Sequence, residues 1–91
     1  MAGWRPRLIS VRVAGETVGC VTEKDVVMVL TTIDGDDALA RPLRLALVAD
    51  SPGVALSLAQ ALTLLVLLRD PRPPTDGARR LSRLLLVALR D

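Results

Sequence analysis

The side chains that could carry out chemistry are few in this sequence. It contains no histidine and no tyrosine, and Cys20 is its single cysteine. Without histidine, the most common general acid–base residue is missing, and neither a Ser-His-Asp triad nor a Cys-His pair can be built within one chain. Zinc sites of the usual cysteine and histidine type are excluded for the same reason. The sequence therefore predicts a protein that is not an enzyme.

Cofactor and metal sites are not indicated either. Neither of the glycine-rich phosphate-binding patterns, GxGxxG or GxxxxGK followed by Ser or Thr, occurs. Asp34, Asp36 and Asp37 supply oxygen ligands of the kind that Ca²⁺ prefers, but no closing glutamate follows at EF-hand spacing. We interpret this cluster as a turn and a helix cap, and we expect no metal and no cofactor.

The cysteine content bears on the compartment. A lone Cys20 excludes an internal disulfide, and its apolar neighbours predict a buried, structural thiol. The N-terminal residues contain no apolar stretch of signal-peptide length. A reducing, cytoplasmic location is therefore expected.

The elements that would position these side chains belong to one domain, residues 1–91. The predicted class is α+β, with an N-terminal β-hairpin packed on a small bundle of about four helices. The expected segments are a tail (1–7), a β-hairpin (8–21), helices (22–69), a proline-rich linker (70–74) and a C-terminal helix (75–91).

Periodicity and turn residues support the hairpin. Ile9, Val11 and Val13 alternate with more polar residues, as expected of a half-buried strand. Gly15 suits the turn, and Gly19 within the second strand indicates a bulge or a close backbone approach.

The segment after the hairpin has two interpretations. Residues 26–33 are rich in β-branched side chains and could form a third strand. Thr22, however, is a good N-cap, acidic residues follow it, and Val21 and Val26 occupy hydrophobic-staple positions. The capping pattern favours a helix.

Three further helices are predicted. One follows the aspartate cluster and reaches about Ala49, with an interruption or restart at Arg41-Pro42. The next is opened by Ser51 as N-cap and Pro52 at the first helical position, runs to about Arg69, and has the apolar segment Val54–Leu68 as its main part. The last begins after Thr75, and Asp76 is placed to pair with Arg80 on it.

These helices carry more leucine than a small chain is expected to cover. A domain of this size buries only about 60% of its unfolded surface, so some apolar side chains should remain for a partner. The candidate interface residues are Leu56, Leu64, Leu67, Leu84 and Leu86. We therefore expect a protein-interaction or self-association module that forms a dimer or higher oligomer or binds another protein. It would act as a component of a bacterial or phage assembly or as a regulatory adaptor.

Basic residues gather near the C-terminus. The candidate anion or nucleic-acid contacts are Arg72, Arg79, Arg80, Arg83 and Arg90. These arginines could contact phosphates, or they could simply form a solvated helix face. The absence of interleaved aromatic residues favours the solvated face.

One segment resembles a known DNA-binding motif. Residues Leu45–Leu62 resemble the helix-turn-helix of bacterial repressors, with Ala49 and Gly53 at the small-residue and turn positions. The resemblance implies a small DNA-binding regulator with Ser57 and Gln60 on the recognition helix. Pro52 and Ala59 depart from the motif, and the supposed recognition helix is dominated by leucine.

A membrane-associated protein is a further alternative. Residues 51–68 contain no charge, but this run is shorter than the about 20 apolar residues that a spanning helix needs. A buried helix in a protein core explains the run better.

Overall fold

The computed structural model describes residues 7–33, 37–69 and 75–90 of the chain. The predicted tail before Arg7, the linker 70–74, the candidate contact Arg72 and two of the clustered aspartates, Asp34 and Asp36, lie outside these residues. The elements in chain order are β1 (Leu8–Val13), β2 (Glu16–Thr22), α1 (Glu23–Thr32), α2 (Asp37–Ala46), β3 (Val54–Leu56), α3 (Leu58–Arg69) and α4 (Asp76–Arg90).

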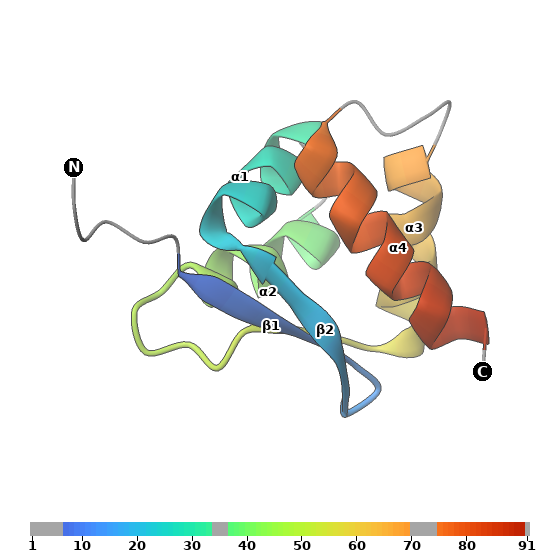
Figure 1. The fold of residues 1–91 in the computed structure, drawn as a ribbon, viewed down its shortest axis with the longest axis horizontal. Helices are drawn as coiled ribbons and strands as arrows, with labels where there is room; N and C mark the ends of the chain where they lie inside the picture. Colours follow the sequence, from blue (N-terminus) through green and yellow to red (C-terminus); the bar gives the residue numbers. More distant parts are fainter. Residues whose placement is uncertain (1–6, 34–36, 70–74, 91) are drawn as a thin grey trace.

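The predicted α+β class is confirmed. Figure 1 shows the N-terminal hairpin with the four helices gathered beside it. A short third strand extends the hairpin into a mixed sheet of order β2-β1-β3, in which β1 is antiparallel to β2 and parallel to β3. Ile9, Val11 and Val13 face the helices and are buried, so the period-two pattern identified the inner face correctly.

The hairpin has the predicted turn and bulge. Ala14 and Gly15 both have positive φ, as a tight two-residue hairpin turn requires. The register shifts after Val11, which lies opposite Gly19, so that one residue of β2 is left without a partner. A Cβ atom on Gly19 would lie 2.5 Å from Cδ2 of Leu84 in α4. Both predictions for Gly19 are therefore confirmed: it lies at a β-bulge, and the Leu84 side chain of α4 approaches its backbone closely.

Residues after Thr22 form a helix rather than a third strand. The Thr22 hydroxyl accepts a hydrogen bond from the Asp25 amide at 3.1 Å, and the Asp25 carboxylate accepts one from the Thr22 amide at 3.0 Å. This capping box satisfies two amides that the first turn of α1 leaves without helical partners. Local capping thus outweighs the β-branched composition of the segment.

The predicted helix Val54–Leu68 is wrong in its first turn. Val54 and Leu56 lie in β3, beside Val11 and Val13 of β1, and both fill the core. The helix begins at Leu58 because Ser57 and Gln60 form a capping box, with bonds of 2.9 and 3.1 Å.

The predicted cap Ser51 has a different role. Its hydroxyl accepts a hydrogen bond from the Gly53 amide at 3.3 Å, so it closes a local turn before β3 instead of starting a helix. Ser51-Pro52 therefore forms a turn, and the helix start is indicated by the Ser-x-x-Gln pattern of Ser57 and Gln60.

Pro42 does not interrupt α2, although an interruption was predicted. A proline within a helix leaves the carbonyl four residues earlier without its amide donor. Here that carbonyl belongs to Ala38, and the side-chain amide of Gln60 donates to it at 3.4 Å. The helix ends at Ala46, and the Arg7 guanidinium donates to the carbonyl oxygens of Ala46 and Val48 there. Arg7, which the sequence placed in the tail, is therefore part of the fold.

The last helix, α4, starts as predicted, but its Arg80 forms a different ion pair from the one expected. The Thr75 hydroxyl accepts from the Ala78 amide at 3.1 Å, which confirms the cap. Arg80 does not pair with Asp76 but reaches across to Asp25 of α1. α4 packs against α1, α3 and β2 and closes the core. The largest fully buried side chains are Leu43, Leu64, Leu68, Leu81, Leu85, Val11, Val26, Val29 and Val54.

Candidate interaction surface

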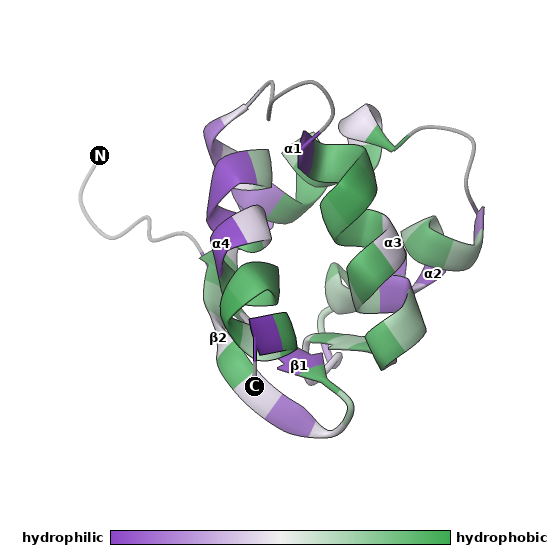
Figure 2. Cartoon of the chain, turned by 90° about the vertical axis from the view of Figure 1, so that its right-hand side faces the viewer, coloured by the Kyte–Doolittle hydropathy of each residue, from purple (hydrophilic) through white to green (hydrophobic). Residues whose placement is uncertain are grey.

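Helix α3 is apolar on two opposite faces. Its inner face is buried among the core residues and consists of Ala61, Leu64, Leu65 and Leu68. Its outer face carries four large aliphatic side chains that remain 42–59% exposed: Leu58, Leu62, Val66 and Leu67. No charged residue occurs in α3 before Arg69. Figure 2 shows α3 as an almost continuous hydrophobic ribbon, whereas α4 includes strongly hydrophilic residues.

The outer face of α3 has an alternating relief. Leu58, Leu62 and Val66 are spaced four residues apart and form a ridge of large side chains. Ala59 and Thr63, one position further around the helix, form a lower row beside that ridge, and Leu67 ends this row; all three are exposed. A ridge next to a shallow row is the geometry by which one helix packs against another.

A hollow continues this surface beyond the first turn of α3. It has a volume of about 420 Å³ and is lined by residues of the hairpin, α3 and α4, including Val18, Leu58, Val87 and Ala88. Val87 is 58% exposed, and Glu16 and Thr17 of the hairpin contribute the polar part of the lining. The outer face of α3 and this hollow together form the "α3 surface", with Leu58 common to both.

The predicted interface residues separate into three groups. Leu56 and Leu64 lie in the core and are at most 4% exposed, so the fold leaves them no access to a partner. Leu84 and Leu86 are half-buried and pack against the core. Of the five candidates, Leu67 alone belongs to the α3 surface. Leu56 is covered because it has the inward phase of β3, and Leu64 because it lies on the inner face of α3, the helix that packs against α4.

The sequence contains a signal for the exposed face of α3. Leu58 and Leu62, which were not among the predicted interface residues, are both 56% exposed. Thr63 and Arg69 are also exposed, and Arg69 follows Leu62 by seven residues, which places it on the same side of a helix. These two polar residues therefore mark the outer side of α3.

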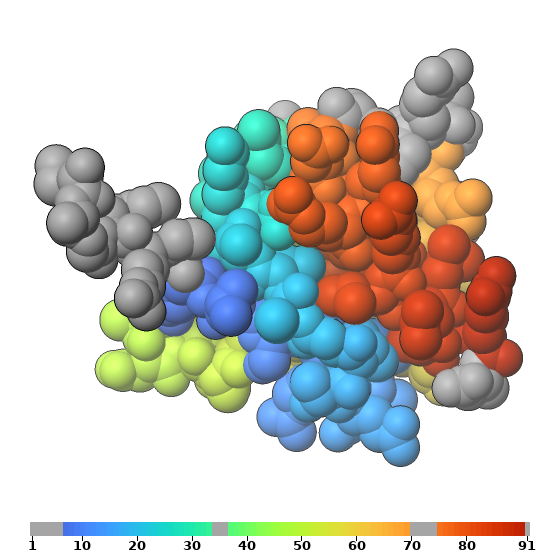
Figure 3. All heavy atoms as spheres, in the orientation of Figure 1, coloured from blue at the N-terminus to red at the C-terminus, as the bar shows by residue number. Residues whose placement is uncertain are grey.

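The arginines of α4 lie partly on one exposed face. Arg79, Arg83 and Arg90 fall within an arc of about 40° around the helix axis, as their spacing requires. All three are exposed, and within the described part of the chain none has a carboxylate within salt-bridge distance. Arg80 differs, since its guanidinium lies 2.8 Å from the buried Asp25 carboxylate. Figure 3 shows α4 lying open on the face in view.

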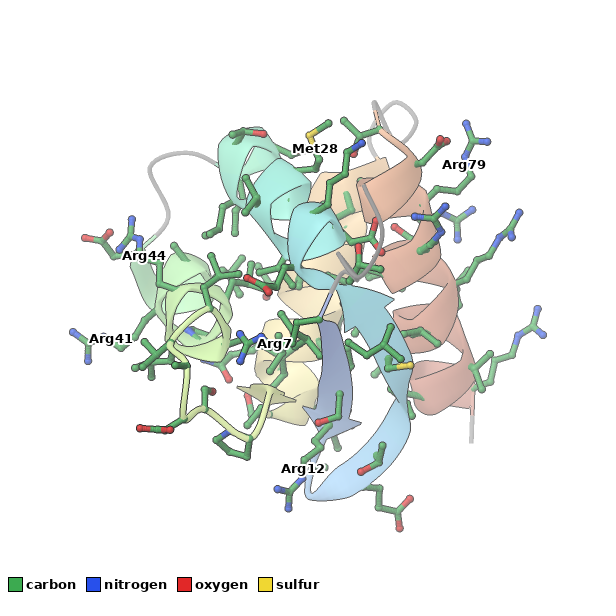
Figure 4. All side chains as sticks on the ribbon, turned by 60° about the vertical axis from the view of Figure 1, so that its left-hand side comes forward. Arg7, Arg12, Met28, Arg41, Arg44 and Arg79 are labelled. Atoms are coloured by element: carbon green, nitrogen blue, oxygen red, sulfur yellow. The ribbon has the colours of Figure 1, made fainter. Side chains whose placement is uncertain are left out.

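A second apolar area lies on α2 and the segment that leads into β3. A shallow groove of about 380 Å³ runs between α2, the loop before β3 and β3 itself, and it is lined by Leu45, Val48, Pro52 and Ala55 among others. Leu45 and Val48 are 57% and 54% exposed. Arg41 and Arg44 of α2 lie beside this area and away from Arg79, as Figure 4 shows.

Cys20 is exposed, although a buried thiol was predicted. Val21 points into the core, and successive side chains of a strand point to opposite faces. Cys20 therefore lies on the outer face of the sheet, opposite Ser10 of β1. A strand residue whose side chain points away from the core stays exposed even when its neighbours in the sequence are apolar.

The described residues contain no group of three cysteine, aspartate or glutamate side chains that could hold a metal ion. In the same part of the chain, no helix has the length and apolar character needed to cross a membrane. The helix-turn-helix resemblance does not hold in the structure, because α2 ends at Ala46 and β3 occupies the start of the supposed recognition helix.

Comparisons with known proteins add no relative. No family model, no curated protein and no solved structure matches this chain.

Proposed function

We propose that this chain is a non-catalytic self-association module and that a second copy of the chain covers the outer face of α3. The observation that carries the proposal is the set of four large aliphatic side chains on that face, which are exposed on a helix without charge before Arg69. Contiguous exposed apolar surface of this kind is typical of protein interfaces. Such a module would act in an assembly of several copies or as a regulatory adaptor.

The relief of α3 suits a second α3 in the antiparallel direction. Around a two-fold axis near Leu62 and Thr63, the ridge of each copy can lie in the row formed by Ala59 and Thr63 of the other. Leu58 of one copy then approaches Val66 of its partner. The two Arg69 side chains lie at opposite ends of the contact, so no like charges meet.

The magnitude of the apolar term is consistent with a weak dimer. Fully burying one large aliphatic side chain contributes about 1.5–3 kcal/mol, and about half of that remains available at side chains that are already half covered. Four such side chains from each copy would contribute roughly 6–12 kcal/mol, against an association cost of about 4–15 kcal/mol. The balance favours a dissociation constant on the order of micromolar or weaker.

The test is the mass of the chain in solution. Sedimentation equilibrium from about 1 to about 200 micromolar, the range set by the expected affinity, should show a monomer–dimer equilibrium. Leu62→Arg and Val66→Arg should each shift the chain to monomer, because each places a charge within the contact. Their helical circular dichroism should be unchanged, since both side chains lie outside the core.

The matched control is Leu45→Arg. Leu45 is as exposed as Leu62 but lies on α2, in the groove between α2 and β3 and outside the outer face of α3. This variant should still dimerise. A wild-type chain that is monomeric over the whole concentration range, or equal dissociation of the Leu45 and Leu62 variants, would refute the proposal.

A further inference from the structure

The outer face of α4 presents a rigid row of positive charge. Arg79 and Arg83 are separated by about 6 Å along the helix axis, and Arg83 and Arg90 by about 10.5 Å. The inner face of the same helix is fixed in the core through Leu81 and Leu85, which are at most 1% exposed. The row therefore extends for about 16 Å on an element that cannot turn.

The charge of this row is not balanced within the described part of the chain. The ion pairs found there are Arg7 with Glu23, Arg44 with Asp37 and Arg80 with Asp25. Asp76, in the first turn, is the one acidic residue of α4. Among the described residues, Arg79, Arg83 and Arg90 thus have no acidic partner, whereas the charge of Arg80 is already matched by Asp25.

We propose that this arginine row binds the phosphate backbone of duplex nucleic acid without reading its sequence. A duplex carries one negative charge per about 1.7 Å of axis, so three guanidinium groups on one face of a fixed helix can meet phosphates in any register. α4 has no Asn or Gln side chain with which to read adenine, and we assign its arginines to phosphates rather than to base edges. This contact does not involve the α3 surface.

Two other polyanions fit the row less well. Single strands are held largely by stacking on aromatic side chains, and α4 has none. An amphipathic helix binds a membrane by inserting its apolar face, but the apolar face of α4 is occupied by the core. A helix that offers positive charge, but neither aromatic rings for stacking nor an apolar face for insertion, therefore suits a duplex better than a single strand or a membrane.

The test is fluorescence anisotropy of a labelled duplex DNA of mixed sequence, titrated with the wild-type chain. Three phosphate contacts predict a log–log salt slope of about −2.7, so the affinity should fall roughly 40-fold between about 50 and about 200 mM salt. Arg79→Glu with Arg83→Glu should weaken binding at low salt more than about 10-fold, because two of the three contacts become repulsive.

The control is a second double variant that has the same change in net charge but leaves α4 intact. Arg12 and Arg41 are exposed on β1 and α2, and Figure 4 shows them away from Arg79. Arg12→Glu with Arg41→Glu should leave duplex binding within about threefold of wild type, an effect of long-range charge alone. Both double variants should keep the helical circular dichroism and the oligomeric state of the wild type, because neither changes α3.

Three results would overturn the proposal. The first is no binding of duplex at low salt by a folded wild-type chain. The second is an equal loss of affinity in the two double variants, which would mean that net charge alone acts. The third is tighter binding to single-stranded DNA, or to vesicles of phosphatidylserine and phosphatidylcholine, than to the duplex.

Discussion

Nη1 of Arg80 lies 2.8 Å from Oδ1 of Asp25, and the Asp25 side chain is only 5% exposed. The other carboxylate oxygen of Asp25 accepts the amide of Thr22. One side chain thus caps α1 and holds α4 against it. Each oxygen of this buried carboxylate has a donor, as the burial of a charge requires.

Asp25→Ala should therefore destabilise the fold more than the loss of an ordinary helix cap. We expect a decrease of about 2–4 kcal/mol in the free energy of unfolding, because the cap and the partner of Arg80 are lost together. Urea denaturation measures it. Asp37→Ala is the control, since its 3.5 Å pair with Arg44 is exposed, and it should cost less than about 1 kcal/mol. Equal effects of the two substitutions would show that the Asp25 network contributes nothing special.

Gly77→Ala should reverse the usual effect of replacing a helical glycine. Alanine at such a position normally stabilises a helix by about 0.5–1 kcal/mol. Here a Cβ would lie 2.8 Å from Cα of Asp25 and 3.0 Å from its carbonyl oxygen, and backbone atoms cannot yield as a flexible side chain does. We expect a loss of roughly 1–3 kcal/mol, from overpacking, in thermal or urea unfolding. A stabilised variant would mean that α1 and α4 are not this close.

Leu64 and Leu62 provide a matched pair within one helix. Leu64 is fully buried and Leu62 is 56% exposed. Leu64→Ala should cost about 2–5 kcal/mol, because it removes contacts and leaves a cavity. Leu62→Ala, measured at a concentration where the chain is monomeric, should change the stability by no more than about 0.5 kcal/mol. Similar losses at both positions would place the outer face of α3 in the core.

Cys20 should react with a thiol reagent in the native protein. Its side chain is exposed on the outer face of the sheet, so 5,5′-dithiobis(2-nitrobenzoate) should label one thiol per chain without denaturant. The same extent of labelling in urea, and at a comparable rate, is the control for access. Labelling that requires denaturation would show that the outer face of the sheet is covered.

Patterns that act over a few residues predicted much of this fold. The alternation of Ile9, Val11 and Val13 defined β1, and the caps at Thr22 and Thr75 defined the starts of α1 and α4. Each of these signals depends on neighbours within about four residues, so a sequence can display it directly.

Contacts between distant residues account for the errors. The pairing of Val54 with Val11 and the salt bridge of Arg80 with Asp25 join segments that no local pattern connects. The side on which α3 is exposed was equally hidden, because a helix with leucine on every side shows little preference for one face. The sequence thus predicted an exposed apolar helix face, but four of the five residues that it assigned to this face lie elsewhere in the structure.

The parallel pairing of β1 with β3 also determines the order in which the chain can fold. The β1–β2 hairpin needs only its own two-residue turn, so it can form while the rest of a nascent chain is still being synthesised. The other edge of β1 stays open until Val54 emerges, after both α1 and α2. An open edge attracts strands of other chains, and a pairing between such distant residues slows folding. Translation that pauses before β3 would therefore expose the growing chain to aggregation at the strand that later lies at the centre of its sheet.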